Sequence, residues 1–275
     1  MSSQDFGIRT AQAIRPPSTA NLMIDSADRN QTQYTNPFNF QIQKPQALLN
    51  GYFTRIGVSE VVMEWCEPNI PESSFTIDCS GTHVIDLSGG FYTVSGLLNT
   101  IKDKVNAAVP SALSLSGDAY TPIFILATQP IEFDTSYVTS ALGIATGQQQ
   151  TRYEITCPDL RLYRYIDIVC EDLTSVQRVK DSATTPYPHD VLTRWYCSED
   201  GEETYDELGF PILMGYKQYS RRRLFNPPKQ IRWEQNLPVG NLRFVAYGRT
   251  VGNLYVSVET GSDTNWEMTL QLSEN

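Results

Sequence analysis

Apolar and polar residues alternate along several stretches of the chain. The clearest alternation lies in segment 266–272, whose apolar face consists of Trp266, Met268, Leu270 and Leu272. Segment 242–247 alternates in the same way, and segment 254–259 has an apolar face of Leu254, Val256 and Val258. A period of two is typical of half-buried antiparallel strands, so these segments predict a mainly β fold.

A longer apolar segment from Phe53 to Trp65 predicts a strand that changes face halfway. Its first half places Ile56 and Val58 on one face, and its second half places Val61, Met63 and Trp65 on the other. A β-bulge near Ser59-Glu60 would produce this change.

Two further strands are expected outside the middle of the chain. A polar, turn-rich lead (residues 25–37) opens into a short strand at Phe38–Ile42. Another strand is expected at Arg161–Cys170, where Arg164 falls awkwardly among the residues that should point inward: Leu162, Ile166, Ile168 and Cys170.

The middle of the chain has a different pattern. Strands at 75–79 and 83–87 are expected to form a hairpin through Ser80-Gly81-Thr82. A helix over 95–109 should begin at Thr93 or Ser95 and end before Pro110, followed by a strand at 123–126 and a short helix at 136–142. We therefore expect residues 73–147 to form an α+β insertion subdomain in a β-sandwich built from residues 21–72 and 148–275. Residues 1–20 are expected to be a flexible N-terminal arm.

The charge and the cysteines narrow the choice of partner and compartment. The chain has 275 residues, a formal net charge of −10 and 21 basic residues against 31 acidic ones, which argues against a protein that coats nucleic acid. We therefore expect no specific nucleic-acid partner. The five cysteines are scattered and form no C-x-x-C pair, which favours folding in a reducing compartment. No signal peptide and no apolar run of membrane-spanning length is recognisable.

The residues that commonly carry catalysis are sparse. Only two histidines occur, His83 and His189, and neither accompanies a nucleophile motif or a phosphate-binding loop. The sequence therefore predicts no catalytic, cofactor-binding or metal-binding residues, and no enzyme. Two alternatives stay open: a lectin-like or receptor-binding sandwich, whose surface aromatics would be Trp195, Tyr196 and Tyr205, and a carboxylate-based glycosidase, for which no particular pair of acids stands out.

A series of short motifs resembles one family of viral proteins. The first is Ile24–Asn30, which matches an Ile/Val-Asp-Ser-x-x-Arg-Asn signature. The others, in order, are Gly90-Phe91-Tyr92 before the first helix, Leu142-Gly143, Phe225-x-Pro227 before Ile231-x-Trp233, Gly240-x-Leu242, and Trp266-Glu267-Met268-Thr269-Leu270. Together they are similar to the penton and other minor capsid proteins of tailless icosahedral double-stranded DNA viruses, of the virophage, polinton-like and adenovirus-related kind.

The resemblance implies a fold, a function and a location. The sandwich would be an antiparallel jelly roll, the subunits would meet around fivefold vertices as a homopentamer, and neighbouring major or minor capsid proteins would surround them. The arm would lie on the inner side of the shell, and the insertion would face outward toward a host receptor or a fibre. The protein would be made in the host cell, in cytoplasm or nucleus, and would reside in the virion; contact with an inner membrane stays open.

We also expect particular residues to make assembly contacts. The tyrosine-rich strands would bury against neighbours, because tyrosine offers a large amphipathic contact area. An ordinary half-exposed sheet face would explain these tyrosines equally well. Arginines of the arm and of the only dense basic run, read as a surface loop, are further candidates. The full set is Arg9, Arg15, Arg221, Arg222, Arg223, Tyr163, Tyr165, Tyr247 and Tyr255.

Overall fold

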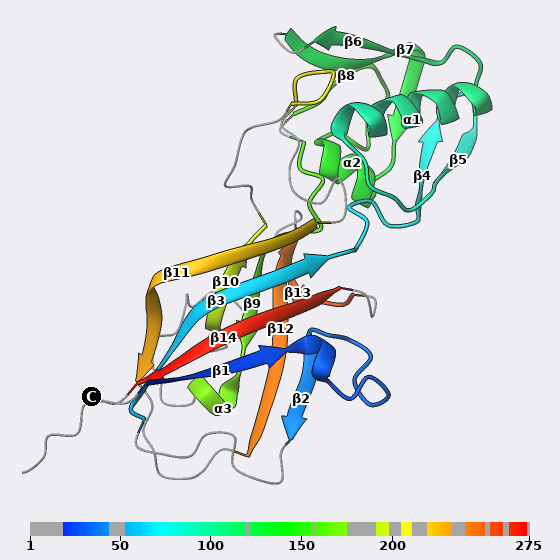
Figure 1. The fold of residues 1–275 in the computed structure, drawn as a ribbon. Coiled ribbons are helices and arrows are strands. Elements are labelled where there is room, and N and C mark those ends of the chain that lie inside the picture. Colours follow the sequence, from blue (N-terminus) through cyan, green and yellow to red (C-terminus); the bar gives the residue numbers. More distant parts are fainter. Residues whose placement is uncertain are drawn as a thin grey trace, which may run out of the picture.

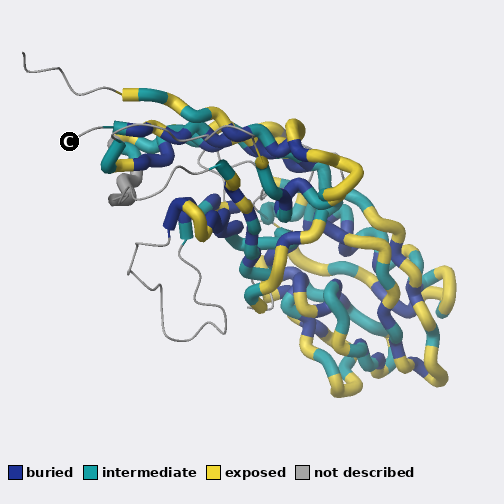
Figure 2. The backbone as a smooth tube through the Cα atoms, turned by 90° about the horizontal axis from the view of Figure 1, so that it is seen from below, coloured by how far each residue is buried: buried dark blue, intermediate teal, exposed yellow. Residues whose placement is uncertain are grey.

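The computed structural model divides into a β-sandwich and a smaller α+β unit at one end of it (Figure 1). The structure describes residues 19–43, 53–118, 121–156, 158–174, 191–197, 205–210, 219–232, 240–250, 254–260 and 264–273. Each part has its own cluster of buried apolar side chains. In both parts the buried positions run along the interior of the fold, with exposed positions outside (Figure 2).

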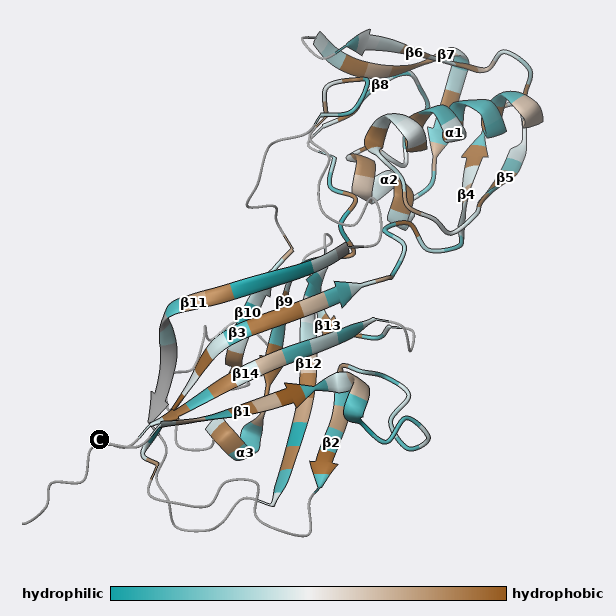
Figure 3. Cartoon of the chain, viewed as in Figure 1, coloured by the Kyte–Doolittle hydropathy of each residue, from teal (hydrophilic) through white to brown (hydrophobic). Residues whose placement is uncertain are grey.

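The first sheet of the sandwich has the strand order β1-β14-β3-β11. Its strands are β1 (Thr19–Asp25), β14 (Asn265–Ser273), β3 (Arg55–Trp65) and β11 (Tyr219–Arg232), and all neighbours are antiparallel. The apolar face expected for segment 266–272 is confirmed, because Trp266, Met268, Leu270 and Leu272 are all buried. Hydrophobic and hydrophilic residues alternate visibly along β14 (Figure 3).

The second sheet has the order β10-β9-β12, and both β2 and β13 pair with the other edge of β12. The strands are β2 (Asn39–Gln43), β9 (Tyr163–Val169), β10 (Val191–Tyr196), β12 (Asn241–Thr250) and β13 (Tyr255–Ser257). From β12 the inner face of this sheet contributes Leu242, Phe244 and Ala246, as expected. The rings of Phe40, Phe244 and Trp266 lie 5.5–5.6 Å apart and join the two sheets.

The strand pairs are nested in a way that defines a jelly roll. Strand β1 pairs with β14, β2 with β12, β3 with β11, and β9 with β10, so the first strand meets the last and the middle two meet each other. This is the pattern of one long hairpin rolled into a sandwich of two sheets. The fold is therefore mainly β, an antiparallel jelly-roll sandwich, as predicted.

The predicted bulge in β3 is confirmed and lies at Ser59. On both neighbouring strands the register skips this residue, since Leu270 pairs with Val58 and the adjacent Thr269 pairs with Glu60. The extra residue lets Val58 and Val61 both point into the core.

The α+β unit is inserted between β3 and β9. It contains β4 (Ser73–Asp78), β5 (Thr82–Leu87), α1 (Val94–Ala108), β6 (Leu113–Asp118), β7 (Thr121–Phe133), α2 (Tyr137–Leu142) and β8 (Gln150–Glu154). Thr93 caps α1 by accepting a hydrogen bond from Gly96 N, and α2 ends at Gly143 in the left-handed conformation. The hairpin and both helices match the expectation, whereas β6 and β8 were not foreseen.

The second core extends beyond residue 147. Strand β8 pairs with β7, and the buried side chains of Tyr153, Ile155 and Leu160 belong to the insertion's cluster. The later segment 205–210 joins it as well, because Asp206 accepts a hydrogen bond from Ser95 N at the start of α1. We therefore propose that the insertion extends to about residue 160 rather than 147.

Two expectations about strands of the sandwich are wrong. Segment 221–228 is not a basic loop ended by prolines: β11 runs through it, and its register with β3 shifts between Leu224 and Lys229. Of the apolar face expected in segment 254–259, Val258 is buried in the core as predicted, but Leu254 and Val256 are 65% and 37% exposed, because the short strand β13 lies at an edge where nothing in the described chain covers that face. The arm, residues 1–20, lies outside the described residues except for Thr19 and Ala20, which open β1.

Candidate interaction surface

The Ile24–Asn30 motif forms a structural corner between the two sheets. Ile24 is buried in the sandwich core, and Asp25 accepts a hydrogen bond of 2.7 Å from Ala27 N, which starts a short 3-10 helix at Ser26–Asp28. Ser26 is also buried, and its Oγ accepts a hydrogen bond of 2.8 Å from Trp266 N on β14. No catalytic role is needed to explain these residues, because each of them helps to hold the corner in place.

Arg29 completes this corner. Its guanidinium is buried and donates to the carbonyl oxygens of Ser26, Tyr34 and Thr35 and to Asn265 Oδ1, at 2.7–3.2 Å. Burial lowers the pKa of Arg29, and the nearby charge of Asp25 opposes that shift. The planar fork of arginine suits this set of four acceptors, since no other side chain presents as many fixed donors.

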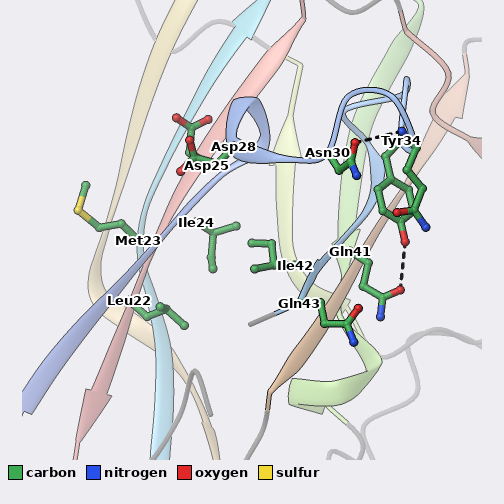
Figure 4. A pocket seen from close by; sticks show the side chains of 11 residues that line it. Leu22, Met23, Ile24, Asp25, Asp28, Asn30, Tyr34, Gln41, Ile42 and Gln43 are labelled. Carbon is green, nitrogen blue, oxygen red and sulfur yellow. Dashed lines mark hydrogen bonds between the residues drawn. The ribbon is translucent and has the colours of Figure 1, made fainter. Parts of the chain in front are cut away.

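A groove of about 570 Å³ lies beside this corner, between β1 and β2 (Figure 4). Asp25, Asp28, Gln41 and Gln43 give it a largely polar lining, and Tyr34 donates a hydrogen bond of 3.2 Å to Gln41 inside it. In the described part of the chain no group of three or more His, Cys, Asp or Glu side chains is arranged to hold a metal ion. The groove offers hydrogen bonds but no arrangement of acid, base and nucleophile.

Tyrosine and arginine side chains gather on the outer face of the second sheet, at the end nearest the insertion. The register places Tyr196, Tyr165, Arg249 and Tyr255 in one row across β10, β9, β12 and β13. The next row holds Arg194, Asp167 and Tyr247. We call these seven residues the Tyr–Arg face.

Asp167 is the buried residue of this face, and it holds Arg194 and Tyr255 in place. Its carboxylate is 1% exposed, accepts hydrogen bonds of 2.6 and 2.9 Å from Arg194, and accepts another of 3.0 Å from the hydroxyl of Tyr255. The hydrogen bond from Arg194 to Asp167 raises the pKa of Arg194, and burial together with the charge of Asp167 raises the pKa of Tyr255. Two outer residues are therefore held in fixed positions by one buried charge.

The aromatic rings are ordered by these contacts. The Arg194 guanidinium lies 4.0 Å from the ring centre of Tyr165, and the rings of Tyr165 and Tyr196 meet edge to face at 6.2 Å. Tyr247 and Tyr255 stack at 5.6 Å with an interplanar angle of 16°. A pre-ordered set of half-exposed aromatic and arginine side chains is the composition typical of protein–protein contact centres.

Within the basic run 221–223, Arg223 extends the Tyr–Arg face around the sheet edge, whereas Arg221 lies over the core-facing ring of Trp195. Arg221 and Arg223 pair with positions of β3 that point inward, and their guanidinium groups lie over the rings of Trp195 and Tyr196, at 5.9 and 5.5 Å. Arg222 points outward and forms an ion pair with Glu60. Arg222 and Arg223 therefore lie on two different surfaces of the sandwich.

The structure brings together three of the four tyrosines expected at contacts: Tyr165, Tyr247 and Tyr255. Tyr163 differs, because its ring packs edge to face on Trp65 at 6.0 Å and a side chain at Gly248 would collide with it. Arg9, Arg15 and His189 lie outside the described residues. Asp167, Arg194 and Arg249 were not foreseen. A period of two could have found two of them, because Asp167 lies two residues from Tyr165 and Arg249 lies two residues from Tyr247.

Of the aromatics proposed for a sugar-binding module, Tyr196 and Tyr205 are 47% and 55% exposed. Trp195 is 1% exposed and faces the core, so its ring cannot stack on a sugar. The helices within the described residues are all too short or too polar to cross a membrane.

Comparison with known proteins identifies similar structures. No family model and no curated protein matches the sequence. Among solved structures the chain is similar to the mavirus penton protein, with a TM-score of 0.49 and 13% identity over 95% of this chain and 100% of that one. It is also similar to a chain in the cryo-EM structure of the Sputnik virophage, with a TM-score of 0.48 and 11% identity over 94% of this chain and 98% of that one. The assignment of the jelly roll rests on the strand pairing described above.

Proposed function

We propose that this protein is a structural subunit of a viral capsid, namely the penton subunit at fivefold vertices or a related minor capsid protein. It would act by contact between subunits rather than by catalysis. The observation that carries the proposal is the nested strand pairing, with the Ile24–Asn30 motif at its first corner and a separately packed insertion between β3 and β9. A fold alone does not define a function. Here it agrees with the order of motifs along the sequence.

The Tyr–Arg face supports a role in assembly. Three of its tyrosines and one neighbouring arginine, Arg223, were singled out from the sequence as contact residues. Their side chains are half-buried. Asp167 holds Tyr255, Arg194 lies over the ring of Tyr165, and Tyr247 stacks on Tyr255, so little side-chain entropy of these tyrosines remains to be lost when a partner covers them.

The partners would be further copies of the chain, as a homopentamer, and the neighbouring capsid proteins. The insertion would face outward, toward a host receptor or fibre, because its own hydrophobic core lets it project from the end of the jelly roll (Figure 1). The mature protein would reside in the virion.

The test is the solution mass of the full-length chain by light scattering and sedimentation over a range of concentrations. A discrete ring, pentameric above all, is the expected result. Tyr196→Ala should raise the concentration needed for half-assembly by about tenfold, a change that corresponds to about 1.4 kcal/mol. Tyr205→Ala is the matched control, since Tyr205 is similarly exposed but lies outside the Tyr–Arg face.

A lectin-like or receptor-binding module is the second candidate, favoured by the exposure of Tyr196 and Tyr205. A glycan array probed with the monomeric protein separates the two functions. Specific sugar binding that both alanine variants abolish, together with a monomer at every concentration, would favour the module and contradict the capsid proposal.

A further inference from the structure

The outer face of the first sheet is acidic at the end nearest the insertion. Asp25 and Glu267 are cross-strand neighbours, and Glu267 lies beside Val62 of β3. Glu60 and Glu64 flank Val62 on the same side of β3. We call Asp25, Glu60, Glu64 and Glu267 the acidic face.

The charges of this face are poorly compensated. Partial burial and the charges of Asp25, Glu64 and Glu60 together raise the pKa of Glu267. Arg222 forms an ion pair with Glu60, but among the described residues Glu64 and Glu267 have no ion-pair partner. With Arg222 paired to Glu60 and Arg29 near Asp25, the charges of Glu64 and Glu267 stay uncompensated within the described chain, and a cationic partner would relieve the repulsion among the carboxylates.

Exposed apolar side chains lie beside these acids. Met23 and Leu224 are 75% and 63% exposed, and the register places them in one row with Thr269 and Glu60. A partner for this face therefore needs both positive charge and apolar surface.

The Tyr–Arg face has both properties. The carboxylate of Asp167 is already neutralised by Arg194, which leaves Arg249 as a cation with no ion-pair partner in the described chain. At the adjoining edge, the guanidinium of Arg223 lies over the rings of Tyr196 and Phe225. The tyrosine rings supply the apolar contact area.

From this match we propose that the acidic face of one copy binds the Tyr–Arg face of the next copy. The inference rests on the proposed function, in which the chain assembles with itself, and it names the two surfaces that meet. The contact is heterologous, because the two surfaces are different parts of the same chain.

The positions of the two faces favour a closed ring. The acidic face lies near the end of β3, just before the chain enters the insertion, and the Tyr–Arg face lies near the start of β9, just after it returns. Both faces are thus at the same end of the sandwich but on opposite outer sides. When the acidic face of one copy binds the Tyr–Arg face of the next, neighbouring copies lie side by side at the same height, as in a ring. If the two surfaces lay at opposite ends, each copy would be displaced along an axis and the copies would form a filament.

Charge reversal tests this contact. Glu267→Arg and Arg249→Glu should each raise the concentration for half-assembly by at least about tenfold, since like charges brought together across an interface are unfavourable. The double variant carries reversed charges on both faces of every copy, and assembly should return to within about threefold of the wild type. Assembly of the wild type should also weaken in about 1 M salt, where the Debye length is about 3 Å.

Two insertion variants control for net charge. Asp103→Arg makes the same change in net charge as Glu267→Arg, and Lys104→Glu makes the same change as Arg249→Glu. Both control positions lie on α1, away from the two faces. The inference would be overturned if Glu267→Arg assembled at the same concentration as the wild type, or if the double variant assembled no better than the single variants. Either result would leave the capsid proposal standing. A wild type that stays monomeric at low salt would also overturn the inference. If Tyr196→Ala left the concentration for half-assembly unchanged, that result would contradict the proposed role of the Tyr–Arg face.

Discussion

Arg29 and Asn265 are 236 residues apart in sequence, and a hydrogen bond of 3.0 Å joins the Arg29 guanidinium to the Asn265 side chain. The same Asn265 oxygen lies 3.4 Å from Ser26 Oγ, so the first corner of the chain is tied to the start of the last strand. This relationship gives the Ile24–Asn30 motif a physical role, which is to hold the β1–β2 connection onto β14.

We predict that Arg29→Ala destabilises the protein by about 2–4 kcal/mol, because four acceptors, of which the Ser26 carbonyl oxygen is buried, lose a charged donor at once. Arg29→Lys should recover only part of the loss, since an ammonium group cannot span all four. Urea unfolding measures both changes. Arg222→Ala, at an exposed ion pair, should stay within about 0.5 kcal/mol of the wild type. Equal losses at both positions would contradict the role of Arg29.

Gly143 and Gly147 provide a matched pair inside the insertion. Both have positive φ, 67° and 75°, but a side chain at Gly143 would collide with the carbonyl oxygen of Thr156, whereas nothing lies within 4 Å of one at Gly147. Gly147→Ala should cost about 1 kcal/mol through backbone strain alone, and Gly143→Ala clearly more. Limited proteolysis of the insertion and urea unfolding would show the difference; identical results would rule out the collision.

The pair Asp159–Arg161 makes stability depend on pH. Burial alone would raise the pKa of Asp159, but the two hydrogen bonds of 2.7 Å and the charge of Arg161 outweigh it and hold that pKa below the ordinary 3.8. A depressed folded-state pKa contributes stability above pH 3.8 that is lost as the pH falls through the folded value.

Asp159→Asn should therefore reduce the free energy of unfolding at pH 7 and flatten its fall in acid. Arg161 also donates to the carbonyl oxygen of Cys197, and Asp159 N donates to Ala141 O, so the pair links the insertion to the residue that follows β10. Unfolding curves from neutral to strongly acidic pH measure the effect. If the free energy of unfolding fell with decreasing pH in the variant as it does in the wild type, Asp159 would contribute nothing to the acid dependence of stability.

Cys170 and Cys197 should resist alkylation in the folded protein. Both are buried, and burial raises the pKa of each thiol to about 12, so only about one part in 10⁴ is thiolate at pH 8. Cys66 is half-buried and should react sooner. Peptide mapping after timed alkylation, with and without urea, gives the order; rapid labelling of Cys197 without urea would contradict this account.

Much of the fold was readable from local patterns. The alternation in 266–272, the change of face in β3 and the Thr93 cap of α1 depend on residues close together in sequence, so a strand or helix signal suffices to find them. Strand β8 was missed because only Tyr153 of its five residues is buried, and β1 because Asp25 and its polar neighbours suggested a turn.

The interaction surfaces were decided by the tertiary structure. Alternation along one strand tells which side chains leave the core, and on that basis three of the contact tyrosines could be named. It does not tell which strands become neighbours or in which register they pair. Asp167 meets Arg194 from 27 residues away and Tyr255 from 88, and only that meeting allows a carboxylate to stay buried on an outer face. A single strand's sequence cannot encode a partner's position, because cross-strand contacts exist only after the chain has rolled up.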